Sequence, residues 1–347
     1  MAEPTNGRAK QRQRTWSAFG DIRRRPTDYE IGTHGTNWTL RKGRKAAFEQ
    51  NPSSPANLWM LTYRDRSPLQ VEDWDAFRDP DTLTYRAYVT QQDEQETRVA
   101  GVLEQYADVN ADATLSPAWR ATLARLFTPT RYPVHGGQQV LAYIGMMAPS
   151  PYITNPAALA AADMLRRVTL VSYRTRELQL AWPDEGFATG ERAVWESDEA
   201  WQPARRAVEL ALTAYDWAEA FTALNLVLLP TLDDVLLRQL GEVARDNGDE
   251  LTWLLNSSLL RDSERRGRWS QALARYAIAQ RPENADVLQR WVGKWAPRAD
   301  AAAEGLGSLL EDVPEHGRPA GEAADGARQA RSELLHASLG LEAPVTS

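Results

Sequence analysis

The chain has 347 residues, a net charge of −7 and no cysteine, which excludes disulfides, thiolate metal sites and cysteine nucleophiles. Its mild acidity argues against a general affinity for nucleic acid, so we expect no nucleic-acid partner. No apolar run reaches the roughly 18 to 20 residues of a membrane span, and the N-terminus lacks the apolar segment of a secretion signal. We therefore expect a cytoplasmic protein that binds no membrane.

The first 69 residues show little helical periodicity. Residues 1–15 are polar and basic, which predicts a disordered tail, with contact to an anionic partner as the alternative. Residues 16–69 are too long for a structureless loop inside a compact domain, so we interpret them as an extended arm on a partner's surface. Arginine and aromatic side chains often anchor interfaces, and the candidates for partner contact are Arg23, Arg25, Tyr29, Glu30, His34 and Trp38.

From residue 70 to residue 297 the pattern is helical, and no convincing strand pattern occurs. Apolar residues at spacings of three and four predict a helix over residues 85–106. Ser116-Pro117 and Asn155-Pro156 are helix starts, because an N-cap side chain precedes a proline, and the second opens a helix to about residue 180. Further helices are predicted over residues 138–148, 204–215, 217–229, 232–246, 250–261, 269–280 and 283–295.

Beyond Pro297 the composition changes to alanine, glycine, glutamate and proline. This composition is typical of linkers, so residues 298–347 are predicted to be a low-complexity C-terminal tail with a short helix near residues 327–339. The sequence therefore predicts an all-α protein whose single helical domain covers residues 70–297.

The predicted domain lacks the residues with which helical bundles hold two iron ions. Such a bundle needs two Glu-x-x-His pairs and two further carboxylates, because residues three apart face one side of a helix. The residues three before His34 and His135 are Ile31 and Tyr132, which cannot bind iron. Glu333-x-x-His336 is a single pair inside the predicted tail. We therefore expect a di-iron scaffold without metal or catalytic residues.

Gln92, Asp93 and Glu96 are the most enzyme-like cluster of the predicted helices. One interpretation is a vestigial metal shell. The other is a helix face whose acids pair with arginines, because buried carboxylates need partners. An acidic shell without a metal cation would repel itself, so we favour pairing with arginines such as Arg98, Arg166, Arg167 and Arg174.

Three segments of the chain resemble the hydroxylase β subunit of soluble di-iron monooxygenases, the family of the toluene, phenol, methane and propane monooxygenases. They resemble its N-terminal arm, its helix B region and its later helices. The residues that carry the resemblance are Arg25 to Glu30 with Thr33-His34, Leu83 to Arg86 with Tyr88, Gln92-Asp93 and Glu96, and Gly248 to Glu250 with Asn256, Arg261-Asp262 and Trp269. The resemblance covers residues 20–297 and is closest to the propane and cyclic-ether type.

The resemblance implies a ferritin-like helical bundle without iron ligands that pairs with a catalytic α subunit, two αβ units forming the hydroxylase. Oxygen and a small hydrocarbon, cyclic ether, phenol or toluene would react at the di-iron centre of the α subunit. Electrons would come from NADH through the FAD and 2Fe–2S groups of a partner reductase, and a coupling protein would regulate the α subunit. This chain would then be a non-catalytic, structural subunit.

Two other classes of protein stay open on the sequence alone. The first is a ferritin-type protein with its own di-iron or di-manganese centre, which the missing Glu-x-x-His pairs oppose. The second is a stand-alone helical adaptor or nucleic-acid-binding protein, which the acidic net charge opposes. Metal analysis of the purified chain separates the first class from a structural subunit, and the identity of its co-purifying partner separates the second.

Overall fold

The computed structural model describes residues 24–34, 54–337 and 340, and every regular element within them is helical. The prediction of an all-α protein is therefore confirmed. The α-helices, in chain order, are α1 (Asp28–Thr33), α2 (Pro55–Met60), α3 (Tyr85–Asp108), α4 (Pro117–Thr122), α5 (Arg131–Met147), α6 (Pro151–Ala181), α7 (Glu191–Ser197), α8 (Gln202–Ala211), α9 (Trp217–Phe221), α10 (Leu229–Asp233), α11 (Leu240–Asp246), α12 (Glu250–Gln280), α13 (Asn284–Glu311) and α14 (Ala320–Ser332).

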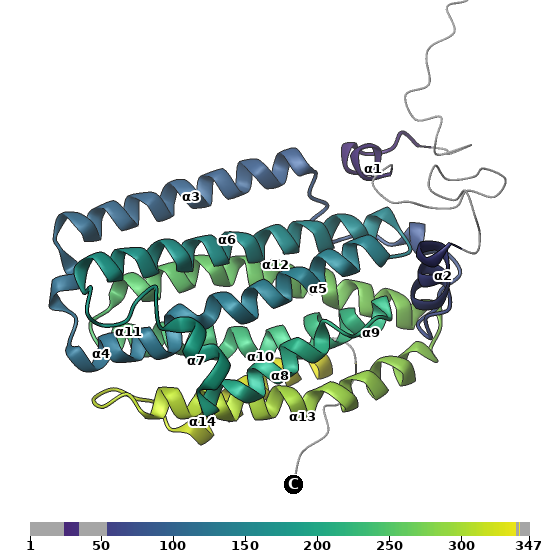
Figure 1. The fold of residues 1–347 in the computed structure, drawn as a ribbon. Helices are drawn as coiled ribbons and strands as arrows, with labels where there is room; N and C mark the ends of the chain where they lie inside the picture. The colour runs from purple at the N-terminus through teal and green to yellow at the C-terminus, as the bar shows by residue number, and fades with distance from the viewer. Residues whose placement is uncertain (1–23, 35–53, 338–339, 341–347) are drawn as a thin grey trace, which may run out of the picture.

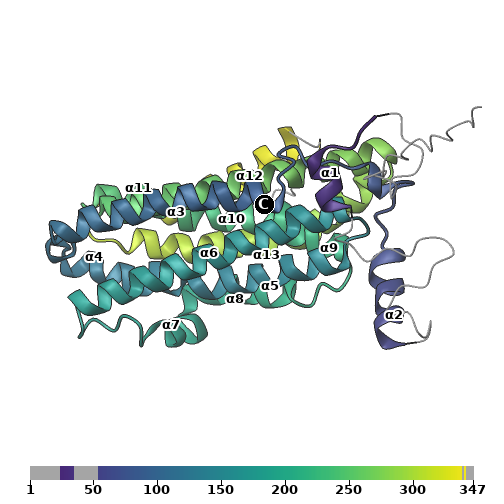
Figure 2. The same ribbon diagram turned by 90° about the horizontal axis from the view of Figure 1, so that it is seen from above.

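The long helices run side by side along one axis. Figure 1 shows α3 along one long side of the bundle and α13 along the opposite side, with α6, α12 and α5 between them. The short helices α1 and α2 lie at the same end of the bundle, apart from each other (Figure 2). Leucine, alanine and valine side chains fill most of the interior, together with large aromatic ones such as the fully buried Trp119, Trp201, Trp217 and Trp269.

The residues Trp217–Asp246 form one continuous helical stretch in which π-helical turns at Thr222–Leu228 and Asp234–Gln239 alternate with α9, α10 and α11. The expected break at Pro230 is absent, because the wide turn before it leaves room for a proline that cannot donate to the ladder. By length and composition this stretch could span a membrane, against the expectation that no apolar run is long enough. However, 94% of its most apolar window is buried inside the bundle, so it serves as the core helix.

Three further helices differ from the expected boundaries. The helix α6 begins at Pro151 rather than near Asn155, because Ser150 caps it by accepting from the Tyr152 amide at 3.2 Å. The helix α12 is continuous over Glu250–Gln280, where two helices were expected. The helix α13 passes through Pro297 and ends at Glu311.

The predicted low-complexity tail is largely a structured part of the bundle, so this prediction is wrong for residues 298–332. The end of α13 packs against α14, and Arg331 of α14 donates to Asp300 of α13 at 2.7 Å in the interior. The glycines of this region permit close contact: a Cβ at Gly305 would collide with the Ala200 carbonyl oxygen. The alanine- and glycine-rich composition of this region is typical of linkers, but here it allows two helices to pack closely.

The predicted extended arm over residues 16–69 also contains helices within its described part. The helix α1 begins with a capping box in which Thr27 accepts from the Glu30 amide and Glu30 accepts from the Thr27 amide. The helix α2 begins with Ser54 as its N-cap and Pro55 at its first position. These local start signals explain why the segment is not simply extended.

Candidate functional site

The interior of the bundle holds a buried carboxylate between two guanidinium groups. Asp233 of α10 accepts from Arg167 of α6 at 2.7 Å and from Arg266 of α12 at 2.5 Å. Ser263 of α12 donates to the same carboxylate at 2.9 Å. Asp233, Arg167 and Arg266 are each only 4% exposed, so three helices meet at a buried polar centre.

The charge balance of this centre opposes metal binding. Burial disfavours the charged carboxylate, but Arg266 and Arg167 outweigh it and hold the pKa of Asp233 below its usual range. Two fixed cations around one carboxylate repel a metal ion and occupy the oxygens that would bind it. Among the described residues, no group of three His, Cys, Asp or Glu side chains could hold a metal ion. A di-iron centre therefore does not fit this site.

A second polar network joins α3 to α6 and α12. Asp163 of α6 accepts from Tyr88 at 2.8 Å, from Gln92 at 3.1 Å and from Arg265 at 2.6 Å. Asp262 of α12 accepts from Gln92 and Arg265, each at 3.0 Å. Arg265 and the side-chain amide of Gln92 thus each donate to both carboxylates, and this network connects α3 to α6 and α12.

Asp163 and Asp262 both accept from one nitrogen of Arg265, and Arg166 adds a second cation on the Asp262 side only. Burial, together with repulsion by Asp262, raises the pKa of Asp163 to about 6 despite the opposing effect of Arg265. The Asp163 Oδ2 atom is buried and has no hydrogen-bond partner. A proton on Asp163 would relieve both the repulsion and part of the burial penalty.

The structure separates the three residues that the sequence grouped as a vestigial metal shell. Gln92 points into the network just described, whereas Asp93 is exposed on α3. Glu96 pairs at 2.5 Å with Arg166, which also binds Asp262 at 2.7 Å. Carboxylate–arginine contacts are therefore the rule on this side of α3.

The residues predicted to contact a partner subunit differ in how exposed they are. Tyr29 and Glu30 are buried against the chain's own bundle: the Tyr29 ring lies 5.9 Å from the Tyr152 ring, and Glu30 binds Arg24 and Arg78 at 2.6 and 2.8 Å. Arg25 is exposed and His34 is half-buried. The remaining two candidates, Arg23 and Trp38, lie outside the described residues.

The sequence did not single out four of the charged residues that form the two interior networks, namely Asp163, Asp233, Arg265 and Arg266. A signal for them does exist in the phase of the helices. Along α12 the buried residues Leu255, Leu259, Asp262, Arg266 and Trp269 follow one another at steps of four and three. Charged residues at positions of an apolar stripe predict buried ion pairs.

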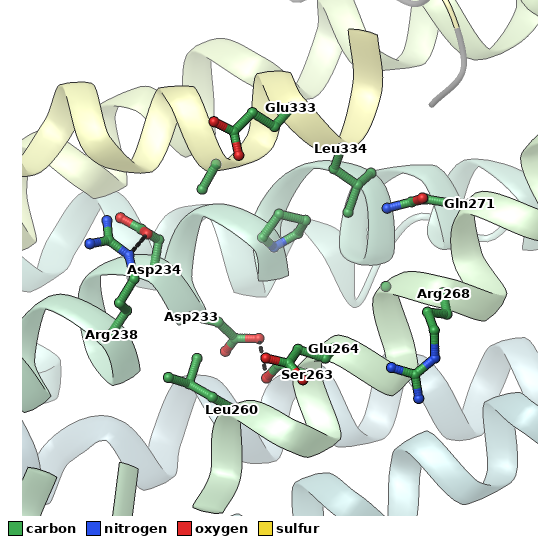
Figure 3. A pocket seen from close by; sticks show the side chains of 13 residues that line it. Asp233, Asp234, Arg238, Leu260, Ser263, Glu264, Arg268, Gln271, Glu333 and Leu334 are labelled. Carbon is green, nitrogen blue, oxygen red and sulfur yellow. Dashed lines mark hydrogen bonds and ion pairs between the residues drawn. The ribbon is translucent and has the colours of Figure 1, made fainter. Parts of the chain in front are cut away.

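A cavity of about 500 Å³ opens beside Asp233 between α10, α12 and the chain after α14. Figure 3 shows Asp233 turned to Ser263 and Asp234 turned to Arg238, with Glu264 and Glu333 at the wall. Because Asp233 and Asp234 already bind cations of the chain itself, the cavity offers no free set of metal ligands. It contains no histidine among its lining residues.

Comparisons with known proteins identify the family. The methane, phenol and alkene hydroxylase family matches residues 59–281. The β subunit of the hydroxylase component of the toluene-4-monooxygenase system of Ectopseudomonas mendocina is 41% identical over 87% of this chain and 92% of its own length. A chain in a solved structure of toluene 4-monooxygenase with toluene in its resting active site superposes with a TM-score of 0.81 at 40% identity, over 87% of this chain and 99% of that chain.

The chain therefore belongs to the methane, phenol and alkene hydroxylase family, as a β subunit of the hydroxylase of a soluble di-iron monooxygenase. The expected closeness to the propane type is wrong. The small subunit of propane 2-monooxygenase from Gordonia sp. strain TY-5 is only 25% identical over 85% of this chain and 80% of its own length, far below the toluene relative. The resemblance in the arm and helix B region therefore did not identify the substrate type.

Proposed function

We propose that this chain is the non-catalytic, structural β subunit that pairs with a larger α subunit, two αβ units forming the hydroxylase. In this assembly the α subunit carries the di-iron centre and oxidises an aromatic hydrocarbon such as toluene in the cytoplasm. The single observation that carries the proposal is the buried centre in which Arg167 and Arg266 bind Asp233. This chain has the same helical bundle as its relatives, and the cations at this buried centre are the guanidinium groups of Arg167 and Arg266 in place of metal ions.

The aromatic substrate is supported by sequence similarity. The relative named for toluene shares 41% of its residues with this chain, and the one named for propane shares 25%. Electrons would reach the α subunit from NADH through a reductase with FAD and a 2Fe–2S cluster, and a coupling protein would complete the system. The ligands of a reactive metal site must be held to within about 0.5 Å. This chain contributes by docking on the α subunit as a rigid bundle, which restricts movement of the α-subunit helices that carry those ligands.

The test is to co-express the full-length chain, carrying an affinity tag, with the larger hydroxylase subunit encoded beside it. We expect a complex with two iron ions per αβ pair, and no iron on the chain when it is purified alone and incubated with Fe²⁺. With reductase, coupling protein and NADH, toluene should be hydroxylated faster than propane. Stoichiometric iron on the isolated chain, or hydroxylation of toluene by the α subunit alone at the rate of the complex, would overturn the proposal.

A further inference from the structure

The outer face of α6 carries large apolar side chains that the described residues leave uncovered. Leu165, Tyr173 and Leu180 are 46%, 53% and 66% exposed. Their spacings of eight and seven residues place them on one face of the helix. A helix that is buried on its inner side and apolar on part of its outer side is typical of a contact with another protein.

A groove lies beside this face, between α6 and the outer helix α3, which run next to each other in both views of the bundle (Figures 1 and 2). Two adjoining hollows of about 390 and 330 Å³ share Leu103, Ala107 and Glu177. Small and apolar side chains line much of the groove, so a partner helix could approach the backbone closely.

The rim of the groove is acidic. The helix α3 carries five acidic and two basic side chains, and Glu104 forms no ion pair within the described residues. Tyr173 of α6 lines the groove, where the charge of Glu177 and, more weakly, that of Glu104 raise the pKa of its phenol group. Glu177 is already paired with Arg174 of its own helix at 3.2 Å, so Glu104 is the carboxylate beside the ring that is left for a partner. An exposed aromatic ring next to such a carboxylate attracts a cationic side chain, through both ion pairing and the face of the ring.

We propose that the groove between α3 and α6 receives a helix of the catalytic subunit, whose apolar face covers Leu180 and Leu103 and whose arginine or lysine binds Tyr173 and Glu104. The inference rests on the proposed function and names the face that meets the partner. Charge complementarity identifies the occupant as basic, and the amphipathic helix is the element that fits a long apolar groove. The arginine or lysine is the anchor, since interface energy concentrates at such central contacts.

The test measures dissociation of the co-expressed αβ complex on dilution, by mass photometry, at several salt concentrations. Tyr173→Ala should weaken association by about tenfold or more. The variant Glu104→Gln should weaken it at low salt and flatten its salt dependence. The matched control Glu315→Gln changes an exposed carboxylate in the turn after α13 and should leave association unchanged. Unaltered circular dichroism and thermal melting of each variant show that the fold persists.

A competing surface lies at the other end of the bundle, where the rings of Trp59, Tyr63 and Tyr215 pack with centroid distances of 4.6 to 5.6 Å and Tyr215 is 43% exposed. Tyr215→Ala should leave association unchanged if the groove receives the partner. Weakening by Tyr215→Ala with no effect of the groove variants overturns this inference and leaves the structural role intact. Failure of the unmodified chain to associate with any larger subunit overturns the proposed function itself.

Discussion

Arg266 donates to Asp233 over 2.5 Å, and each of these side chains is 4% exposed. The pair joins α12 to α10, and Arg167 adds α6 to the same carboxylate. One carboxylate thus forms ion pairs with two buried guanidinium groups. At this point the three helices contact one another through ion pairs rather than through apolar packing.

Removing the carboxylate should therefore be costly. Asp233→Ala leaves two buried guanidinium groups without their counter-charge, and we expect the free energy of unfolding to fall by about 3–5 kcal/mol. Urea unfolding followed by circular dichroism measures this loss. The triple variant Arg167→Met, Asp233→Leu and Arg266→Met should cost less than Asp233→Ala alone, because it removes the charges together. A loss below about 1 kcal/mol for Asp233→Ala would contradict the assigned pairing.

Asp163 predicts a specific dependence of stability on pH. Its pKa is raised from 3.8 to about 6 by burial and by Asp262, so the folded chain binds this proton more tightly than the unfolded chain. The stabilisation is complete below pH 4 and is lost as the pH rises through 6. Relative to Asp163→Asn, the unfolding free energy of the unmodified chain should fall by up to about 3 kcal/mol between pH 4 and pH 7.

The measurement is a series of urea unfolding curves across this pH range for both proteins. Asp93→Asn is the control, since it makes the same chemical change on α3 at an exposed position and should shift stability by the same small amount at every pH. A constant difference between the unmodified chain and Asp163→Asn over pH 4–7 would show that Asp163 does not titrate in this range.

The sequence predicted much of the helical bundle from periodicity and local start signals. It placed α3 well because the apolar residues follow the helical period, and the structure adds Thr84 as the N-cap of this helix. It misjudged the segment after Pro297, because glycine and alanine are equally typical of a linker and of two helices in close contact. Gly305 and Gly307 lie where two chain segments are in close contact. Only the positions of the neighbouring segments distinguish such a contact from a linker.

For the site, the sequence predicted the type of contact, a carboxylate paired with an arginine, but not which residues form each pair. Favouring arginine partners for the acids of α3 agrees with the contact between Glu96 and Arg166. The choice of Asp233 as the partner of Arg167 and Arg266 could not follow from the sequence. Arg167 and Arg266 lie 66 and 33 positions from Asp233 along the chain. The three residues are on different helices, and their meeting depends on how the whole bundle packs.

Two glycines of α13 make a matched pair for testing the packed C-terminal region. Gly305→Ala places a Cβ against the Ala200 carbonyl oxygen, whereas Gly293→Ala meets nothing within 4 Å. We expect Gly305→Ala to destabilise the chain by about 1–3 kcal/mol through overpacking, and Gly293→Ala to stabilise it by about 0.5–1 kcal/mol through helix propensity. Thermal melting measures both. Equal effects of the two substitutions would mean that this half of α13 is not packed as described.

Glu30 fixes the short helix α1 to the bundle, and its removal should release this helix. Arg24 holds the pKa of Glu30 well below its usual range, with help from Arg78, so the contact persists at all but strongly acidic pH. Glu30→Gln weakens both pairs, and we expect the backbone amides of α1 to exchange with deuterium about five- to tenfold faster. Asp28→Asn, an exposed neighbour in the same helix, should change exchange much less. Equal protection in Glu30→Gln and the unmodified chain would assign the anchoring of α1 to Tyr29 alone.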